Sequence, residues 1–364
     1  MRNHTSAIGS RLSILLLVLA VLVAACGGSS TGSAPQASAS SAPPTQEVAR
    51  GEARPFTVML DWTPNTNHAG LYVAQERGWY ADAGLDVQII QPGEQGGLPA
   101  LASGDADVAV SVQEAVTPAR AQGAPVVSVA AIIASNTSSL VALAEEGIER
   151  PADLAGHRYG GFGGDLETEL VTTLVACDGG DPDAVEFVEV GNVDYRAGLE
   201  RDFYDFVWIF DGWDGIRLRQ AGLDIVSLPF ADHFDCIPDW YTPLLATSEQ
   251  MIAEQPEVLR AFMEATARGY RVAIDDPDAA ADALLAGAGE LDEDLVRASA
   301  AHLADRYAPD GPWGVQEAGV WDAFTAFLRT AGILTDDIDV DAAWTNEFLP
   351  DEDRLASPPA SQTR

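Results

Sequence analysis

The chain has 364 residues and carries 56 acidic against 20 basic side chains, which gives a formal net charge of −36 at pH 7. Nucleic acids are bound mainly through cationic side chains on the phosphate backbone, so this acidity excludes nucleic acid as a partner. With three cysteines and five mostly isolated histidines, the sequence shows no metal-ligand spacing and no Ser/His/Asp arrangement. We therefore expect no metal, no cofactor and no enzymatic activity.

The N-terminus has the layout of an export signal. Arg2 and Arg11 precede an unbroken apolar run at 14–23, and Ala24-Ala25-Cys26 follows it. This pattern predicts a cleavable signal peptide over residues 1–25, and the apolar run is too short to span a bilayer. The end of the segment resembles the bacterial lipobox, which implies that Cys26 is lipidated and anchors the exported protein to the outer face of the cell membrane.

Residues 26–54 are mainly Gly, Ser, Ala, Pro and Thr. This composition is too poor in apolar side chains to offset the entropy of ordering the chain, so a flexible linker is expected. The remaining stretch of about 310 residues exceeds what one hydrophobic core usually organises, which favours two lobes.

The first lobe is expected to begin with a strand at 56–60, followed by the polar loop Asp61–His68. Helices and strands then alternate along the chain: a helix at 69–77, a strand at 85–90, a helix at 98–102, a strand at 107–111, a helix at 113–122 and a strand at 126–133. Strands that alternate with helices predict a mostly parallel sheet with helices on its faces.

The alternation breaks around Asn136 and resumes after residue 150. The second series comprises a strand at 158–161, a helix at 167–176, a strand at 185–190, a helix at 195–200 and a strand at 206–210. The chain after residue 248 is helical in character. We expect one lobe at 55–143 plus 246–350, a second at 144–245 and a disordered tail at 351–364, so that the chain crosses between lobes twice.

Besides Cys26 the sequence contains only Cys177 and Cys236. One disulfide between them is possible, but spacing alone does not establish it.

The candidate ligand-binding residues lie in loops that follow the expected strands, because ligands of open α/β sheets bind beyond the carboxyl ends of the strands. These loops are rich in aromatic and acidic side chains. Together with neighbouring polar residues, the set is Asp61, Trp62, Asn65, His68, Gln113, Glu114, Asn136, Phe162, Glu167, Trp213, Asp214 and Tyr241.

Two kinds of side chain in these loops suit a ring-shaped ligand. Trp62, Trp213, Trp240 and Tyr241 are candidate walls on which a flat ring stacks. The carboxylates of Glu114, Glu167 and Asp214 are candidate acceptors for ring amino groups. For each residue the alternative stays open that the aromatic ring belongs to the core or that the carboxylate lies on a solvated surface.

Several motifs resemble the thiamine-pyrimidine family of ABC transporter substrate-binding proteins. The similarity runs from about Phe56 to Pro350 and is carried by Asp61–His68 (DWTPNTNH), Gln113–Arg120 (QEAVTPAR), Asn136–Ser138 (NTS), Trp208–Ile216 (WIFDGWDGI) and Thr345–Pro350 (TNEFLP). The resemblance implies a two-lobed α/β periplasmic-binding-protein-like fold of type II with the ligand cleft between the lobes.

The resemblance also implies a function and partners. Members bind pyrimidine precursors of thiamine, such as formylaminopyrimidine or hydroxymethylpyrimidine, and deliver them to the permease and ATPase subunits of an ABC importer; we expect a monomer. Trp62 and Asn65 would line the first lobe, and Trp213 with Asp214 the second.

One segment departs from the family pattern. Where many relatives have Gly-Trp-Gly-Ser-Pro followed by Glu, this chain has Gly161-Phe162-Gly163-Gly164-Asp165-Leu166-Glu167. The alternative cargo is riboflavin or another aromatic vitamin. A sulfonate or nitrate binder is less favoured because the loops contain few arginines, and a pyrimidine-synthesising enzyme because the cysteine-rich iron site of such relatives is missing.

Overall fold

The structure is a computed structural model that describes residues 53–93, 96–191 and 194–351. The expected signal peptide, Cys26 and nearly all of the expected linker and tail lie outside these residues. None of the helices in the described ranges combines the length and the apolar composition needed to cross a membrane.

The first sheet has five strands in the order β2-β1-β3-β10-β4. β1 is parallel to β2 and β3, whereas β10 is antiparallel to both of its neighbours. The strands β3, β4 and β10 are buried almost throughout and are rich in Val, Leu and Ala, as expected where both faces of a sheet are covered. They are β1 (Arg54–Met59), β2 (Leu85–Ile90), β3 (Val108–Ser111), β4 (Val126–Ala131) and β10 (Leu244–Ser248).

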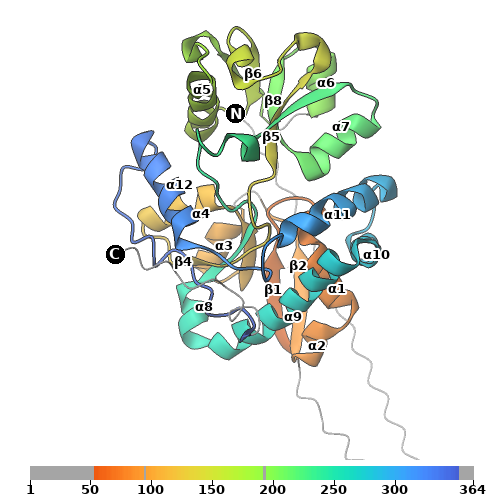
Figure 1. Ribbon diagram of the computed structural model, residues 1–364. Coiled ribbons are helices and arrows are strands. Elements are labelled where there is room, and N and C mark those ends of the chain that lie inside the picture. Colours follow the sequence, from red (N-terminus) through yellow and green to blue (C-terminus); the bar gives the residue numbers. More distant parts are fainter. Residues whose placement is uncertain (1–52, 94–95, 192–193, 352–364) are drawn as a thin grey trace, which may run out of the picture. The chain divides into compact units, whose positions relative to one another are not determined.

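Half of the helical elements in the described residues belong to the chain segments around this sheet. They are η1 (Thr66–His68), α1 (Ala69–Glu76), α2 (Trp79–Asp82), α3 (Gly97–Ser103), α4 (Gln113–Ala121), α8 (Glu249–Glu254), α9 (Pro256–Asp275), α10 (Pro277–Ala288) and α11 (Glu293–Tyr307). Figure 1 shows α1, α2 and α9 beside β1 and β2.

Helix α9 covers the first sheet with one apolar face, as its periodicity predicts. Phe262 stacks on Phe56 of β1 in the core, and Tyr270 packs over Gly70 of α1. The two helices approach so closely that a Cβ on Gly269 would lie 1.9 Å from the carbonyl oxygen of Gly70. Glycine is therefore required at this crossing.

The second sheet has five strands in the order β7-β6-β8-β5-β9. β6 is parallel to β7 and β8, and β5 is antiparallel to β8 and β9. The strands are β5 (Ser138–Leu143), β6 (Arg158–Gly161), β7 (Glu186–Glu189), β8 (Phe206–Phe210) and β9 (Ile225–Pro229).

The helices of this part are short apart from α5. They are η2 (Ala144–Glu146), η3 (Pro151–Leu154), α5 (Asp165–Cys177), η4 (Pro182–Ala184), α6 (Tyr195–Glu200), the π-helical turn η5 (Asp211–Gly215), α7 (Ile216–Gln220) and η6 (Phe230–His233). Cys177 at the end of α5 forms a disulfide with Cys236, with a Cα–Cα distance of 5.9 Å.

The chain passes between the sheets through two crossovers, residues 132–137 and the segment before Leu244. The expected boundary after residue 143 differs from this arrangement because β5 already belongs to the second sheet, and β10 begins before residue 246. β5 and β10 are antiparallel to both of their neighbours, and in the described residues no α-helix lies between β4 and β5 or between β9 and β10. The expected helix–strand alternation therefore contains neither β5 nor β10.

The last helix, α12 (Ala318–Thr330), contacts the cores of both sheets. Trp321 packs in the cluster around Leu244 of the first sheet, whereas Phe324 stacks on Trp240 in the cluster of the second. The C-terminal segment, expected with the first lobe, therefore joins both cores.

Candidate functional site

The loop after β1 is held in place by its own side chains. The Asn65 backbone N–H donates to His68 Nδ1 at 3.2 Å, so the ring proton lies on Nε2, which donates to Asp61 Oδ1 at 2.8 Å. Asn65 Oδ1 also accepts from the backbone N–H of Asn67. His68 and Asn65 are buried by these contacts, while Trp62 stays 43% exposed. Asp61 and Trp62 are thus exposed on this loop, and the buried side chains of Asn65 and His68 stabilise its conformation.

The loop after β3 is joined to the second crossover by two hydrogen bonds. The Gln113 backbone N–H donates to the Tyr241 carbonyl at 2.9 Å, and the Tyr241 N–H donates to Gln113 Oε1 at 2.9 Å. The Tyr241 hydroxyl accepts from the Glu317 N–H, and its ring is buried near Trp321. Tyr241 therefore supports the site from the core.

Glu114 has a buried carboxylate oxygen, Oε2, without a hydrogen-bond partner in the structure. Burial raises the pKa of Glu114 to about 7, and the charge of Asp61 adds to the increase. The Glu114 backbone N–H, Trp240 and Thr242 lower the pKa, yet neither Trp240 nor Thr242 makes a hydrogen bond of ordinary geometry with its indole nitrogen or hydroxyl. The Trp240 indole and the Thr242 hydroxyl are therefore close to the Glu114 carboxylate, but neither makes a hydrogen bond of ordinary geometry to it.

Four buried polar atoms in this region have no partner: Gln113 Nε2, Glu114 Oε2, Trp240 Nε1 and Thr242 Oγ1. They come from two segments, 113–114 and 240–242, that the paired hydrogen bonds hold together. Buried polar groups in folded proteins nearly always have a partner. We call these four residues the Glu114 cluster; its atoms without a partner include both hydrogen-bond donors and acceptors.

Asp239 connects the two crossovers next to this cluster. Its carboxylate accepts from the Ser135 hydroxyl at 2.6 Å, the Asn136 N–H at 2.9 Å and the Trp240 N–H at 2.8 Å. The Asn136 side chain in turn accepts from the Ser138 N–H, and its Nδ2 has no partner. Asn136 and Trp240 are thereby held by one carboxylate.

Glu167 in the second sheet stabilises its own loop. Its carboxylate accepts from the Tyr159 hydroxyl at 3.1 Å and from the backbone N–H groups of Phe162 and Gly164 at 2.9 and 3.3 Å. These bonds cap the start of α5. They hold Phe162 in place, whose side chain is 57% exposed.

Asp214 lies buried in the turn η5, and its Oδ1 has no hydrogen-bond partner. Burial raises the pKa of Asp214 to about 6, although Arg217 at 3.7 Å lowers it. Tyr195 lies within electrostatic reach of both Asp214 and Glu167; burial, then these two charges, raises the pKa of its hydroxyl to about 12. The structure thus groups Tyr195, Glu167 and Asp214 in the second sheet.

Trp213 is half-buried and packs against a cluster of α1, α10 and α11 that contains Tyr72, Leu284 and Val296. Nearby, the Ser299 hydroxyl of α11 bonds to the Thr66 hydroxyl and donates to the Gly212 carbonyl. The loop that carries Trp62 and the turn that carries Trp213 are therefore joined through α11.

The structure brings several predicted residues together and leaves others apart. Asp61, Asn65 and His68 form one hydrogen-bonded group, Asp61 acts electrostatically on Glu114, and Gln113 pairs with Tyr241. Trp62 and Phe162 have exposed rings in two different loops. Sequence reasoning missed Tyr195, Asp239 and Thr242, because none of them directly follows an expected strand.

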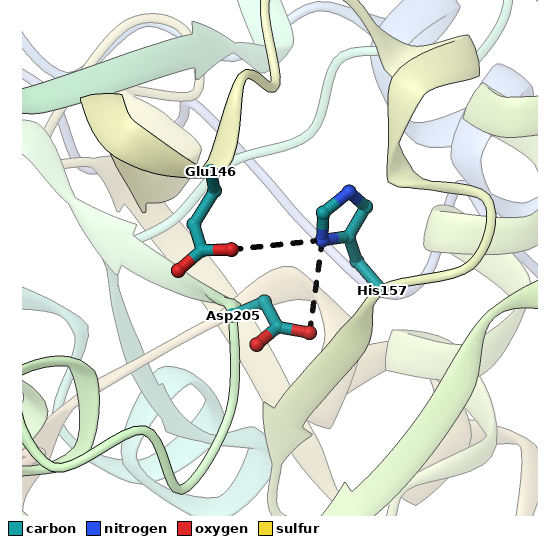
Figure 2. Close-up of side chains that lie close together, drawn as sticks. All are labelled: Glu146, His157 and Asp205. Atoms are coloured by element: carbon teal, nitrogen blue, oxygen red, sulfur yellow. Dashed lines mark ion pairs between the residues drawn. The ribbon is translucent and has the colours of Figure 1, made fainter.

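One group in the described residues brings three possible metal-ligating side chains together, Glu146, His157 and Asp205. Figure 2 shows His157 Nδ1 facing both carboxylates, at 3.9 Å from Glu146 and 3.7 Å from Asp205. The Arg158 guanidinium donates to both oxygens of Asp205. Its positive charge opposes a cation there, so this group is an ion-pair network.

The family model described as "NMT1/THI5 like" matches residues 65–280. A formylaminopyrimidine-binding protein of Halalkalibacterium halodurans is 33% identical over 278 residues, which are 74% of this chain and 83% of that protein. The riboflavin-binding protein RibY of Chloroflexus aurantiacus is 28% identical over 93% of this chain and 98% of that protein. A 4-amino-5-hydroxymethyl-2-methylpyrimidine phosphate synthase of Legionella pneumophila is 23% identical over 81% and 92%.

Among solved structures, the ligand-binding component of an ABC-type import system from Staphylococcus aureus superposes with a TM-score of 0.62 at 14% identity, over 84% of this chain and 99% of that one. This likeness, and others of the same kind, confirm the two-lobed periplasmic-binding-protein-like fold. On the strength of the matched family model and the 33% identical relative, this chain belongs to the NMT1/THI5-like family.

Proposed function

We propose that this protein is the exported substrate-binding component of an ABC importer and that it binds a pyrimidine precursor of thiamine. The cargo would be formylaminopyrimidine or a hydroxymethylpyrimidine-like compound, bound at the Glu114 cluster with Trp62 beside it. Support comes from the export-signal layout of residues 1–25 and from relatives named as binding proteins, which are more similar to this chain than the relative named as a synthase.

The observation that carries the proposal is the chemistry of the Glu114 cluster. An aminopyrimidine presents amino hydrogens next to ring nitrogens that accept. The Glu114 carboxylate can accept from the amino group, while Trp240 Nε1 and Gln113 Nε2 can donate to ring nitrogens and the Thr242 hydroxyl can do either. The ring would satisfy atoms that have no partner without it, and a ligand that lacks a donor would leave Glu114 unpaired at a cost of roughly 1–3 kcal/mol.

Lipidation of Cys26 belongs to the same proposal, since a binding protein that hands cargo to a permease works at the membrane surface. The lobe division at 55–143 plus 246–350 and 144–245 also stays a proposal, with β5 and β10 exchanged between the lobes as their sheets require. Closure of the lobes around the cargo is then a hinge motion at the two crossovers.

The test is a fluorescence titration of the protein without its signal peptide, because Trp62 and Trp240 belong to the proposed site. Formylaminopyrimidine should quench the emission saturably, and Glu114→Gln should weaken binding by roughly ten- to a hundredfold. The matched control is Glu264→Gln on the exposed face of α9, which should bind like the wild type.

The pH dependence gives a second readout. A ring amino group that donates to the ionised carboxylate stabilises the charged form, so affinity should rise as the pH increases to about 7 and then level off. Glu114→Gln should lack this rise. If Glu114→Gln leaves the binding affinity unchanged, the cargo does not bind at the Glu114 cluster.

Riboflavin is the second candidate cargo, favoured by the RibY relative that matches 93% of this chain. Quenching by riboflavin with no response to either pyrimidine would replace the proposed cargo. If the purified protein converted a pyrimidine precursor to a new product, the protein would be an enzyme and the proposed binding role would be wrong.

A further inference from the structure

The second crossover passes from one hydrophobic core to the other at a single peptide bond. Trp240 is buried in the core of the second sheet, where its ring stacks on Phe324 with 5.2 Å between the centroids. The next residue, Tyr241, is buried in the core of the first sheet, and its backbone exchanges two hydrogen bonds with Gln113. The place of Trp240 relative to the rest of the Glu114 cluster therefore depends on how the backbone is held at this point.

The part of Trp240 that concerns a ligand is its indole nitrogen. Trp240 Nε1 is buried without a hydrogen-bond partner, and the indole lies close enough to Glu114 to lower the pKa of that carboxyl. The ring is fully buried and meets Trp208 edge-on, with 6.0 Å between the centroids. A rigid ring carries its N–H with it, and a hydrogen bond weakens steeply as its angle closes. A small rotation of the backbone at residue 240 is therefore enough to misdirect this donor.

One carboxylate, that of Asp239, fixes the backbone at residue 240. Asp239 Oδ1 accepts from the Trp240 N–H at 2.8 Å and from the Asn136 N–H at 2.9 Å, while Oδ2 accepts from the Ser135 hydroxyl at 2.6 Å. Ser135 and Asn136 belong to the first crossover, so a single side chain bonds both crossovers. Both of its oxygens are occupied, and hydrogen bonds to a carboxylate are stronger than those between neutral groups.

The two residues that Asp239 holds by their backbone share an uncommon property. Trp240 Nε1 and Asn136 Nδ2 are both buried side-chain donors without a partner. Buried donors in folded proteins nearly always have a partner. Two donors without one, on the two residues whose N–H groups bond the same oxygen, indicate that this carboxylate arranges groups that are used in binding.

We propose that Asp239 is a positioning residue of the cargo site, which holds the Trp240 backbone so that the indole N–H is directed at cargo bound to the Glu114 cluster. This inference rests on the proposed function, because it requires a cargo at that cluster. Since both oxygens of Asp239 are bonded to protein donors, the residue acts through Trp240 and not by direct contact with the cargo.

The experiment is calorimetric titration of the exported protein with formylaminopyrimidine. Asp239→Ala removes all three hydrogen bonds and should weaken binding by about tenfold or more. Asp239→Asn keeps one oxygen for the two N–H groups and places an amide that can donate to the Ser135 hydroxyl, so its affinity should stay within about threefold of the wild type.

Asp153→Ala is the matched control. Like Asp239, Asp153 is half-buried, and its carboxylate accepts from two backbone N–H groups, those of Glu149 and Arg150, but it belongs to neither crossover. The control variant should bind like the wild type. If Asp239→Ala does not fold, Asp239→Glu replaces it: the charge is kept but the oxygens move by one methylene, so this variant should bind more weakly than Asp239→Asn.

A double-mutant cycle separates positioning from a general loss of structure. Trp240→Phe removes the indole N–H, keeps an aromatic ring beside Phe324, and should weaken binding by about tenfold. If Asp239 acts through this N–H, adding Asp239→Ala to Trp240→Phe should weaken binding by less than about threefold more. Independent effects would multiply, and that result overturns the proposal.

Thermal unfolding without cargo shows whether each variant is folded. The proposal is also overturned if Asp239→Ala binds like the wild type, or if Asp239→Asn binds as weakly as Asp239→Ala. These results would leave the proposed function intact. A wild-type protein that does not bind formylaminopyrimidine, or a Glu114→Gln variant with unchanged affinity, would instead refute the proposed cargo site and this inference with it.

Discussion

Replacement of Glu114 by glutamine should stabilise the protein, and the gain should depend on pH in a defined direction. The folded state raises the pKa of this carboxyl from 4.5 to about 7 because it buries the charge. Between these values the folded protein holds a proton that the unfolded chain has released. Stability therefore falls as the pH rises through this window, and it levels off above about pH 7.

The size of the effect follows from the pKa difference. At roughly 1.4 kcal/mol per pKa unit, the rise from 4.5 to about 7 corresponds to about 3 kcal/mol. Glutamine has a similar shape and never ionises, so the variant lacks this loss. The difference in unfolding free energy between Glu114→Gln and wild type should grow by most of about 3 kcal/mol from about pH 5 to about pH 8.

Urea unfolding at several pH values measures this difference, and comparison with the wild type removes the contribution of other titrating groups such as Asp214. Glu264→Gln on the surface of α9 should show a difference that does not change with pH. If the difference in unfolding free energy between Glu114→Gln and the wild type did not change over this pH range, the claim that burial raises the pKa of Glu114 would be refuted.

Three further changes test the fold. Cys177→Ser should lower the unfolding free energy by about 4 kcal/mol under oxidising conditions, from the 59-residue separation that the disulfide closes, and a reducing agent should abolish the difference from wild type. Gly269→Ala should destabilise by several kcal/mol because its Cβ meets backbone at 1.9 Å, whereas Gly319→Ala in α12, with open space around it, should be neutral or slightly stabilising. Trp213→Ala should cost roughly 2 kcal/mol through lost packing against Tyr72, and an unchanged denaturation midpoint would mean that the ring does not join α11 to η5.

Much of the fold could be predicted from local pattern. The strands at Leu85–Ile90, Arg158–Gly161 and Phe206–Phe210 and the helix at Tyr195–Glu200 have the predicted bounds, because each is a short apolar or capped segment between turn residues. β5, β9 and β10 could not be predicted in the same way. Their partners are distant in sequence: β5 pairs with β8 and β9, and β10 pairs with β3 and β4.

The candidate site could be predicted only as a set of loops. The rule that ligands bind beyond strand ends selects Asp61 and Glu114 as candidates, and the charge of Asp61 acts on Glu114 in the structure. The position of a residue in the sequence does not reveal whether its side chain faces a ligand, caps a loop or packs in the core. Glu167 caps its own loop, and Trp213 packs between helices; both outcomes depend on neighbours that only the tertiary structure supplies.

The place of β10 between β3 and β4 fixes an order of folding for a chain that is synthesised from its N-terminus. Until Ser248 has emerged, β3 and β4 lack their shared neighbour, and their backbone groups have no partner there. The segment from β5 to Cys236 is continuous and contains its own disulfide. The segment that contains most of the second sheet can therefore fold and form its disulfide before the first sheet, which needs β10, is complete.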